Sequence, residues 1–341
     1  MYCWTYDIGA AVHGGTKATR DTCYFLSELG WKLLDTTCRG PSYSRALQLA
    51  WHVTKIITMP SESLVLVQFP AYGVASKIIL RILVRRLKTI VLVHDVDRLR
   101  QRSDGTPETV LKFASFIIFT GKFQAQLAKL SIPSITLGAW DYRLEPGHQC
   151  PNWDRFGAIL FAGSLSHEKN GWLYQDCPAR PRLLLYGNKY KKELNPNADN
   201  YQGEFAPDSP LFQGPISWGL VWEGNSTSRR SESDHHQYYE RFNQPHKLSL
   251  YLACGLPVIV WKKAAIADFV REHRCGILVD RLEEVNSEVR NHTEAEILRF
   301  RENAVALSAK VRSGYFIRQA VQHLTRPSAN LDHAISERAA S

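Results

Sequence analysis

The chain has 341 residues, a length typical of two domains, and 44% of them are hydrophobic, so it can bury substantial cores. Charged residues make up 22%, and no apolar run reaches the roughly 18 residues of a transmembrane helix, which argues against a disordered chain and a helical membrane protein. The net charge is +9, of which +7 lies in residues 1–157. A basic first half suits an anionic partner, such as a membrane surface, a phosphorylated ligand or a nucleic acid.

The cysteines and the N-terminal sequence both indicate the cellular compartment of the protein. The seven cysteines are odd in number and form no CxxC pair. This pattern argues against a zinc site or a disulfide scaffold and favours a reducing cytoplasm. The first 15 residues contain no basic segment leading into an apolar one, so we expect no secretory signal and a cytoplasmic protein.

In the first half, short apolar runs alternate with longer amphipathic stretches. The expected strands are 63–69, 89–94, 116–119 and 134–137, and the expected helices are 16–29, 44–57, 75–87, 107–113 and 122–130. Near-continuous apolar strands separated by helices indicate a parallel sheet that is covered on both faces.

A second series of the same kind follows a linker expected at 143–155, which contains proline and glycine and shows no periodicity. Its expected strands are 157–162, 182–186, 219–222, 257–261 and 276–279, and its expected helices are 245–253, 264–272 and 294–311. Two doubly wound halves joined by one linker leave a cleft. Ligands of such sheets bind beyond the carboxyl ends of the strands, so those positions matter most.

The most informative segment is Arg241–Trp261, RFNQPHKLSLYLACGLPVIVW. Pro245 suits the first turn of a helix, and this placement brings Lys247 into the same turn. A helix N-terminus has free N–H groups and a partial positive charge, so together with a lysine it suits a diphosphate. A capped helix with a solvated lysine is the alternative interpretation.

Another strand end carries small residues and a lysine. Gly163 and Ser164 follow the expected strand 157–162, and Lys169 lies further on. Glycine lets a backbone approach a ligand closely. The segment has neither the P-loop pattern nor the frame of a nucleophile elbow, so an ordinary β–α connection is the favoured interpretation of these residues alone.

The strand at 219–222 runs into Glu223 and Asn225, and a polar segment follows at 226–236. We expect this segment to be a mobile loop. His235 and His236 suggest a metal site, but no carboxylate stands at helical spacing from them, and a solvated loop is favoured.

The first half contains two further candidate sites, one at the start of an expected helix and one at the end of an expected strand. Thr16 and Lys17 stand after two glycines at a helix start, as an anion contact or with Thr16 as the N-cap. Asp95 and Asp97 follow an apolar strand in the run VHDVDR, where they are candidate general bases. The same run could supply metal ligands, or Asp95 could cap the next turn.

Residues 76–88, SKIILRILVRRLK, contain five basic residues and no acidic one. Lys77, Arg81, Arg85 and Lys88 recur at helical spacing and form one stripe of the expected helix. The stripe could lie on an anionic membrane face. The charged outer side of a helix that covers the sheet is the favoured alternative.

Several of these segments resemble those of a known protein family. The run FNQPHKLSLYLACGLPVIVW followed by AAIADFV is similar to the signature of bacterial glycosyltransferases of the β-1,6-galactofuranosyltransferase and glucosyltransferase 3-like group. The runs GGTKATRD, LVHDVDRLR, ILFAGSLS, GLVWEGNS and SGYFIRQAV extend the resemblance over residues 10–325.

The resemblance implies an α/β protein of GT-B fold, with two Rossmann-like doubly wound domains facing across a cleft. Residues 1–150 would bind the acceptor, with a C-terminal helix at 311–325 packing back on them. Residues 157–310 would bind a UDP-sugar without a metal or other cofactor, and residues 326–341 are expected to be a disordered tail.

Roles for individual residues follow from the resemblance. Lys247 would face the donor phosphates and stabilise the charge of the leaving group in place of a divalent ion. Asp95, and after it Asp97, are the candidate bases that take the proton of the acceptor hydroxyl. The residues implied in donor binding are Thr16, Gly163, Ser164, Lys169, Tyr186, Asn225, His246 and Lys247.

The expected activity is transfer of a hexosyl group from a UDP-sugar to a glycan or lipid-linked glycan acceptor in cell-surface polysaccharide synthesis. Galactofuranose is favoured over glucose because the NQPHK and KAAIADF runs most resemble those of the galactofuranosyltransferases.

A lipid-linked acceptor would give the basic half a purpose at the inner membrane face. A non-catalytic transferase-like partner or glycan-binding subunit is the alternative. A nucleic acid is not expected, because no recognised motif is present, and the oligomeric state stays open.

Overall fold

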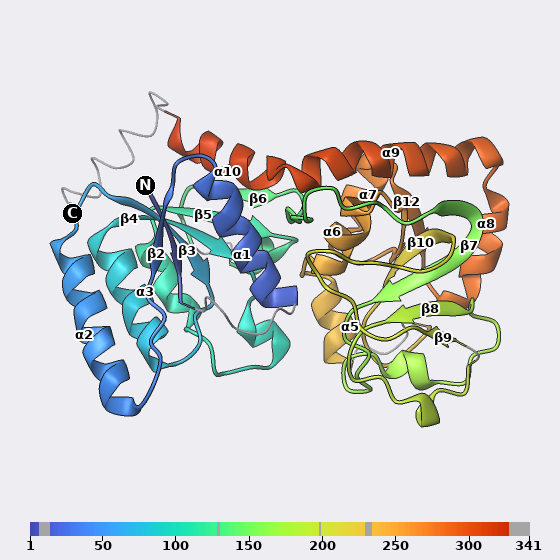
Figure 1. Ribbon diagram of the computed structural model, residues 1–341, viewed down its shortest axis with the longest axis horizontal. Coiled ribbons are helices and arrows are strands. Elements are labelled where there is room, and N and C mark those ends of the chain that lie inside the picture. The colour runs from blue at the N-terminus through green and yellow to red at the C-terminus, as the bar shows by residue number, and fades with distance from the viewer. Residues whose placement is uncertain (7–13, 128–129, 198, 229–233, 327–341) are drawn as a thin grey trace.

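The structure is a computed structural model that describes residues 1–6, 14–127, 130–197, 199–228 and 234–326. Strands and helices alternate through its first half (Figure 1). They are β1 (Tyr2–Thr5), α1 (Gly14–Ser27), β2 (Lys32–Asp35), α2 (Ser42–Thr58), β3 (Leu64–Phe69), α3 (Val74–Arg86), β4 (Lys88–Val93), β5 (Phe116–Thr120), α4 (Phe123–Gln126) and β6 (Ser134–Leu137). Two 3₁₀ turns, Asp97–Arg100 and Glu108–Phe113, lie between β4 and β5.

The second half repeats this alternation. Its elements are β7 (Trp153–Ala162), β8 (Leu183–Tyr186), β9 (Asn200–Tyr201), β10 (Ile216–Val221), α5 (His235–Glu240), α6 (His246–Ala253), β11 (Val258–Trp261), α7 (Ala267–His273), β12 (Gly276–Val279), α8 (Val285–Asn291), α9 (Glu294–Arg312) and α10 (Tyr315–Thr325). Shorter 3₁₀ turns lie at Gly171–Tyr174, Lys192–Leu194 and Leu282–Glu284.

Each half contains a six-stranded sheet whose neighbouring strands are parallel. The first sheet has the order β2-β1-β3-β4-β5-β6, and the second has the order β12-β11-β10-β7-β8-β9. The direction of the strand order reverses between β1 and β3 and between β7 and β10. Such a reversal opens a crevice at the carboxyl ends of the strands, where open α/β sheets bind ligands.

Strand β3 shows why the first sheet is covered on both faces. Val65 and Val67 pack in a core that includes Ile79 of α3, whereas Leu66 points to the other face and packs with Phe25 of α1. Successive side chains of a strand alternate between faces, so a run of apolar residues needs an apolar layer on each side. The continuous apolar pattern that predicted this strand therefore reflects burial on both faces.

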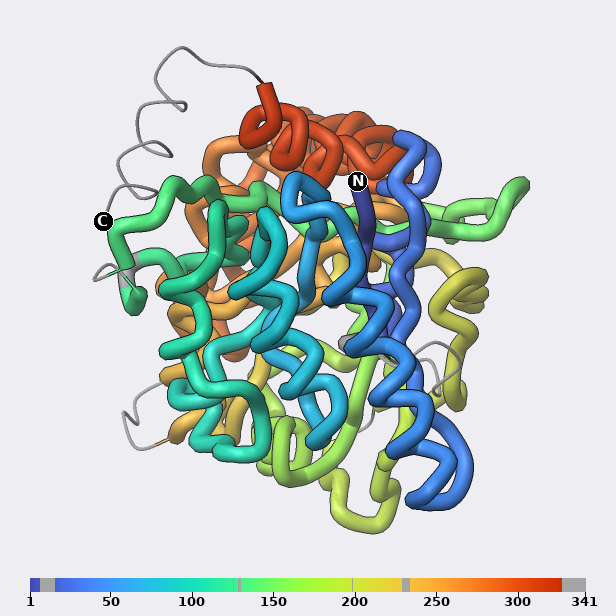
Figure 2. The backbone as a smooth tube through the Cα atoms, turned by 90° about the vertical axis from the view of Figure 1, so that its left-hand side faces the viewer, coloured from blue at the N-terminus to red at the C-terminus, as the bar shows by residue number. Residues whose placement is uncertain are grey.

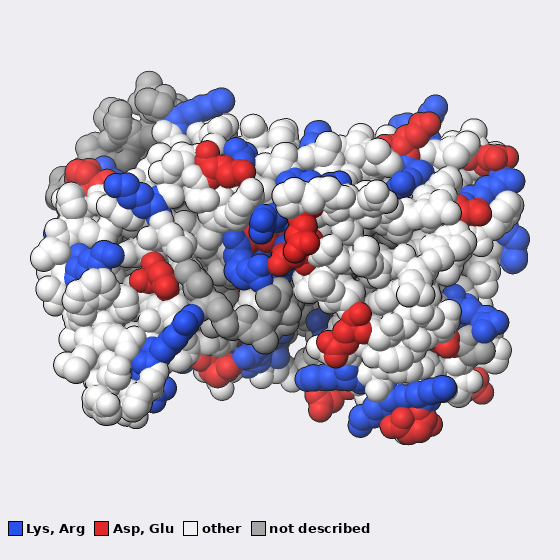
Figure 3. Space-filling view, viewed as in Figure 1, with Lys and Arg blue, Asp and Glu red and all other residues white. Residues whose placement is uncertain are grey.

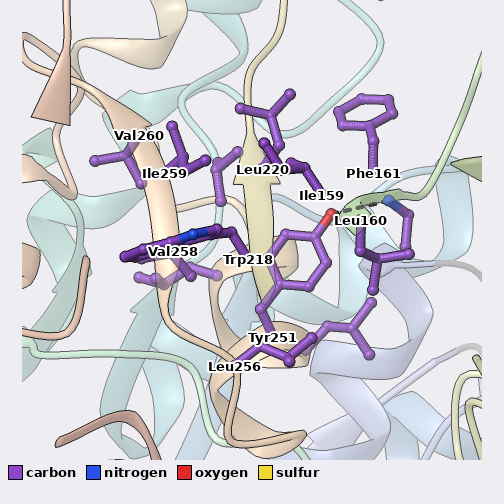
Figure 4. Close-up of a cluster of buried hydrophobic side chains, with 14 of the residues drawn as sticks. Ile159, Leu160, Phe161, Trp218, Leu220, Tyr251, Leu256, Val258, Ile259 and Val260 are labelled. Atoms are coloured by element: carbon purple, nitrogen blue, oxygen red, sulfur yellow. Dashed lines mark hydrogen bonds between the residues drawn. The ribbon is translucent and has the colours of Figure 1, made fainter. Parts of the chain in front are cut away.

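Helix α6 is held against the end of β7 by one side chain. The Tyr251 ring lies among the buried residues of β7, β10 and β11, and its hydroxyl accepts a hydrogen bond from the Ala162 N–H at 2.8 Å (Figure 4). A Cβ atom on Gly219 would overlap this ring, so the strand needs glycine there. The contact sets the position of α6 relative to the carboxyl ends of the second sheet.

The last two helices span both halves along one side of the molecule (Figure 1). Helix α9 packs against α6, and α10 packs against α1 and β6 of the first half. Gly314, at the junction of the two helices, has a φ of +74° and lies against Phe25. The expected tail at 326–341 lies, apart from Arg326, outside the described residues.

The structure contains three strands that the sequence pattern does not predict: β1, β2 and β9. They have four, four and two residues. In β2 only Leu34 is buried, so the strand shows neither a continuous apolar run nor a repeated alternation. Strand β1 is buried because it lies in the sheet between β2 and β3. This pairing joins segments that are distant in the chain, so a local pattern does not reveal it.

Two sequence-based expectations are corrected by the structure. The basic stripe of α3 does not include Lys88, because the helix ends at Arg86 and Lys88 begins β4. The segment expected as a mobile loop, 226–236, includes the start of a helix, α5, whose N-cap Asp234 accepts hydrogen bonds from the N–H groups of His236 and Gln237. A capping residue at that point is a local signal for a helix start. Residues 229–233 of the same segment lie outside the described residues.

Candidate functional site

The loops after β7 and β10 meet the start of α6 at the reversal point of the second sheet. Helix α6 begins at His246 directly after Pro245, which occupies the N-cap position with extended dihedral angles. Lys247 is therefore in the first turn, as the sequence predicts. Because Lys247 and Tyr251 are four residues apart, they share a face of the helix, and that face is the one held against β7.

Lys247 is a buried cation at this point. Its side chain is 10% exposed, its Nζ lies 3.1 Å from the Glu223 Oε1, and it stands 4.6 Å above the centre of the Phe161 ring. Burial lowers the pKa of Lys247, and the Glu223 carboxylate opposes that change. The alternative interpretation, a solvated lysine, is therefore wrong.

Glu223 binds a second lysine as well. Lys169 Nζ also lies 3.1 Å from Oε1 of Glu223, and this lysine is 38% exposed. Burial by itself would raise the pKa of Glu223, but Lys169 and Lys247 outweigh it and hold this pKa well below the usual range. Two ammonium groups thus converge on one carboxylate oxygen, and the cluster carries a net charge of about +1.

Gly163 provides the space that Lys247 occupies. Its φ is +143°, and a Cβ atom there would lie 2.8 Å from Cε of Lys247. The Gly163 N–H donates to the Tyr186 carbonyl at 2.9 Å, and a Cβ on Gly187 would overlap the Gly163 carbonyl. These close approaches explain why the turn after β7 contains a glycine.

The other donor-binding residues expected in the second half differ in how far they are buried and in what they contact. Ser164 is half-buried, and its hydroxyl lies 3.5 Å from both the backbone nitrogen and the hydroxyl of Ser166. Asn225 is exposed, and its backbone N–H donates to Asp234 at the start of α5. The Tyr186 ring is buried against Phe212, and its hydroxyl accepts from the Gln213 N–H at 2.8 Å. Tyr186 therefore borders the cluster through its backbone.

Asp95, after β4, connects the first half to α5. Its Oδ1 accepts a hydrogen bond from the Tyr239 hydroxyl, and its Oδ2 pairs with Arg100 at 2.5 Å. Burial and the Asp95 charge both raise the pKa of Tyr239, and Glu223 adds a smaller effect in the same direction. Tyr239 thus lies between the carboxylate of one half and the lysine cluster of the other.

Asp97 lies deeper in the same loop. Its Oδ1 accepts from the Tyr72 hydroxyl at 2.9 Å, while its buried Oδ2 has no hydrogen-bond partner among the described residues. Burial raises the pKa of Asp97, although the Tyr72 hydrogen bond opposes this. A Cβ on Gly105 would overlap Oδ2, so the carboxyl group faces the loop and not open space.

Thr16 lies in the first turn of α1, and His246 is the first residue of α6, the helix against which α1 packs. The His246 ring lies 4.9 Å from the Tyr142 ring between centres, tilted by 33°. Burial lowers the pKa of His246 to about 3, so the ring is neutral at pH 7. Lys17 lies 4.5 Å from the same tyrosine ring and pairs with Asp21 at 2.7 Å. Lys17 is fully buried and paired, which does not fit the anion contact considered for it.

The structure brings together Gly163, Lys169 and Lys247 at one point, and it adds two residues that the sequence does not single out. Glu223 is visible in the sequence only as a polar residue after a strand. Tyr239 lies just after the polar segment 226–236 expected to be a loop. Within the described ranges, no three His, Cys, Asp or Glu side chains gather closely enough to hold a metal ion. The metal-free donor site stays a prediction, which the titration described below tests.

Comparison with known proteins identifies the family. The family model described as glucosyltransferase 3-like, N-terminal domain, matches residues 5–121, and the model of the corresponding C-terminal domain matches residues 159–324. The chain belongs to the glucosyltransferase 3-like family. This membership confirms the resemblance carried by the FNQPHK run and makes the protein a member of a glycosyltransferase family.

Two relatives are named as glycosyltransferases. The chain is 28% identical over 247 residues to the β-1,6-galactofuranosyltransferase WbbI of Escherichia coli K12, covering 70% of this chain and 72% of that protein. It is 32% identical over 183 residues to glucosyltransferase 3 of Streptococcus gordonii, covering 52% of this chain and 50% of that one.

Solved structures show the same fold. Anabaena HepE in complex with UDP-glucose is 13% identical, with a TM-score of 0.52 and coverage of 99% of this chain and 100% of that one. The sucrose-phosphate synthase of Thermosynechococcus elongatus is also 13% identical, with a TM-score of 0.59 and coverage of 100% and 99%. The expected GT-B fold is confirmed. Among the described residues, no helix is both long enough and apolar enough to cross a membrane.

Proposed function

We propose that this protein transfers a hexosyl group from a UDP-sugar to a glycan or lipid-linked glycan acceptor, without a metal, in cell-surface polysaccharide synthesis in the cytoplasm. The observation that supports this most is the cluster at the reversal point of the second sheet. There, Lys169 and Lys247 lie beside a glycine turn and the first turn of α6. A diphosphate carries the charge that this arrangement would neutralise.

The donor diphosphate would take over the two lysines from Glu223. In the structure one carboxylate oxygen accepts both ammonium groups, so an anion with several oxygens is a better match for their donor capacity. As the bond from the sugar C1 to the phosphate oxygen breaks, UDP gains negative charge, and the lysines would stabilise it. Gly163 would let the phosphates approach the backbone.

The acceptor would enter from the first half. Its hydroxyl oxygen forms the new bond to the sugar C1, and its proton needs a base. We propose Asp95 as that base, since this carboxylate reaches across to Tyr239 on α5, and Asp97 as the second choice. Asp97 faces its own loop and contacts Tyr72, which suits a positioning role in that loop.

We propose galactofuranose as the donor sugar and glucose as the next candidate. The support is the likeness to WbbI, which extends over 70% of the chain, compared with 52% for glucosyltransferase 3 of Streptococcus gordonii. Both sugars are neutral hexoses on the same diphosphate, so a few hydrogen bonds decide between them.

The test is a calorimetric titration of UDP into the full chain in the presence of EDTA. We expect micromolar binding that survives chelation and weakens by about tenfold or more in Lys247→Ala, because a charge-assisted contact to phosphate is lost. Lys192→Ala, which changes an exposed lysine of the same half, is the matched control and should bind as the wild type does.

A turnover assay with UDP-galactofuranose and UDP-glucose then separates the two donors. Glu223 neutralises one of the two lysine charges, and this observation favours the alternative of a non-catalytic partner or glycan-binding subunit. Absence of UDP binding and of turnover in the wild type would support that alternative. Binding that EDTA abolishes would show that the metal-free mechanism is wrong.

A further inference from the structure

Helix α2 exposes apolar side chains on its outward face. Tyr43, Leu47 and Trp51 are 73%, 69% and 60% exposed, and they stand four residues apart, so they form one row along the helix. Ile57 continues the same face with 52% exposure. On a surface helix this face ordinarily carries charged and polar residues.

The inward face of α2 accounts for only part of its apolar content. Its buried residues are His52 and Ile56. The exposed residues within an arc of about 140° around the row are mostly apolar and contain no charge: Tyr43, Ala46, Leu47, Ala50, Trp51, Thr54, Ile57 and Thr58. A contiguous apolar patch of this kind on a monomer marks an interaction surface.

The charges around the patch are basic. Together α2 and the neighbouring α3 contain six basic residues and no acidic one: Arg45, Lys55, Lys77, Arg81, Arg85 and Arg86. Lys55 stands 5.2 Å from the centre of the Trp51 ring. Of the nearby acidic residues, Glu62 pairs with Lys88, and Asp35 accepts hydrogen bonds from Thr37.

These helices form the outer end of the first half. Figure 2, which views the molecule from that end, shows α2 and α3 side by side at the front. In Figure 3 the surface over α2 is mostly uncharged, and Lys and Arg side chains lie beside it together with acidic ones. The apolar residues of α3, such as Ile79 and Leu83, are buried against the sheet, so the apolar contact surface belongs to α2 and not to the α3 stripe.

We propose that the outward face of α2 docks on an anionic lipid surface. Tyr43 and Trp51 suit the boundary between headgroups and acyl chains, Leu47 would insert between them, and the basic residues of both helices would contact anionic headgroups. A second copy of the chain fits this face less well, because a two-fold contact would bring two sets of six basic residues together.

The test is co-sedimentation of the full chain with vesicles of phosphatidylglycerol and phosphatidylcholine, and with vesicles of phosphatidylcholine alone. It uses no donor, so its result does not depend on the proposed transferase activity. We expect binding to the anionic vesicles, and a loss of about tenfold or more in Leu47→Glu/Trp51→Glu, since charge on the inserted face opposes insertion.

The matched control is Leu298→Glu/Val305→Glu, which places the same charges on exposed apolar positions of α9 and should bind as the wild type does. Circular dichroism checks that both variants fold. Equal binding to both kinds of vesicle, no binding by the wild type, or the same loss in the control would overturn the proposal. Concentration-dependent dimerisation that Leu47→Glu/Trp51→Glu removes, without vesicle binding, would assign the face to a second copy.

Discussion

Glu223 is the residue on which the candidate site depends most. It is 4% exposed and holds two lysines, Lys169 from the loop after β7 and Lys247 from the first turn of α6. A buried carboxylate destabilises the fold if its cationic partners are removed. In the same way, the buried lysine destabilises the fold if the carboxylate is removed. In the unliganded protein Glu223 therefore keeps the two ammonium groups close together and positions them for an anion.

We predict that Glu223→Gln lowers the free energy of unfolding by about 3 kcal/mol, because it leaves two ammonium groups without their carboxylate. UDP should restore more stability to this variant than to the wild type, since the phosphates would replace the missing charge. Thermal unfolding with and without UDP measures both effects.

The control for that prediction is Asp199→Asn, which breaks a buried ion pair elsewhere in the same half. Asp199 pairs with Arg180 at 2.5 Å, and both side chains are almost fully buried. This variant should lose stability as well, but UDP should not restore it preferentially. Equal effects of UDP on the two variants would contradict the role assigned to Glu223.

At the scale of elements, α10 is fastened to the first half by a buried carboxylate. Asp141 accepts hydrogen bonds from the N–H groups of Phe316 at 3.1 Å and Ile317 at 2.7 Å, at the start of the helix. Burial raises the pKa of Asp141 to about 7, although these two hydrogen bonds oppose the change. The end of the chain thus returns to the first half through a group that titrates near neutrality.

We predict that the folded protein loses stability as the pH rises from 5 to 8, because the buried Asp141 carboxyl group must give up its proton in this window. The unfolded carboxyl group loses its proton near pH 4, whereas the folded one keeps it up to about pH 7, so unfolding becomes easier as pH rises through this window. The stability advantage of the wild type over Asp141→Asn should fall by about 2 kcal/mol between pH 5 and pH 8.

Urea unfolding of both proteins at several pH values measures this difference, and Asp176→Asn, at an exposed position, is the control. A difference that grows with pH would show that the hydrogen bonds at the start of α10 outweigh burial, and that Asp141 is ionised throughout the window.

At the scale of the whole molecule, the segment before α6 joins the two halves. The Gln244 side chain accepts from the Gly121 N–H and donates to the Gly138 carbonyl, both at 2.9 Å. Its backbone carbonyl accepts from the Trp140 indole at 2.9 Å. The FNQPHK run thus has two roles, since its first residues contact the first half and its last one enters the lysine cluster. The distance between the halves is therefore coupled to the position of α6.

We predict that Gln244→Ala opens the molecule, because two hydrogen bonds between the halves are lost, at a cost of about 1–3 kcal/mol. Small-angle scattering should show a larger radius of gyration. Gln124→Ala is the control, because that amide bonds with Ser134 and Thr136 inside the first half. An unchanged radius in Gln244→Ala would mean that other contacts, such as Lys17 with Asp208, suffice to hold the halves together.

Local patterns of residues are enough to predict the elements that are buried on both faces and to place one lysine of the candidate site. Strands β3, β4 and β5 have apolar runs that need no partner to be recognised, and Pro245 predicts the start of α6 and so the position of Lys247 in its first turn. These are local properties, because hydrophobic burial and helix starts leave a signal within a few neighbouring residues.

Which side chains meet depends on how the elements pack in three dimensions. Glu223 and Lys169 belong to different loops, and Asp95 and Tyr239 are 144 residues apart in the chain. No periodicity encodes such pairs, since they arise from the strand order at β7 and β10 and from the packing of α5 against the first half. The exposed face of α2 was likewise undecided, because an apolar stripe at helical spacing does not reveal whether it faces the core or the outside.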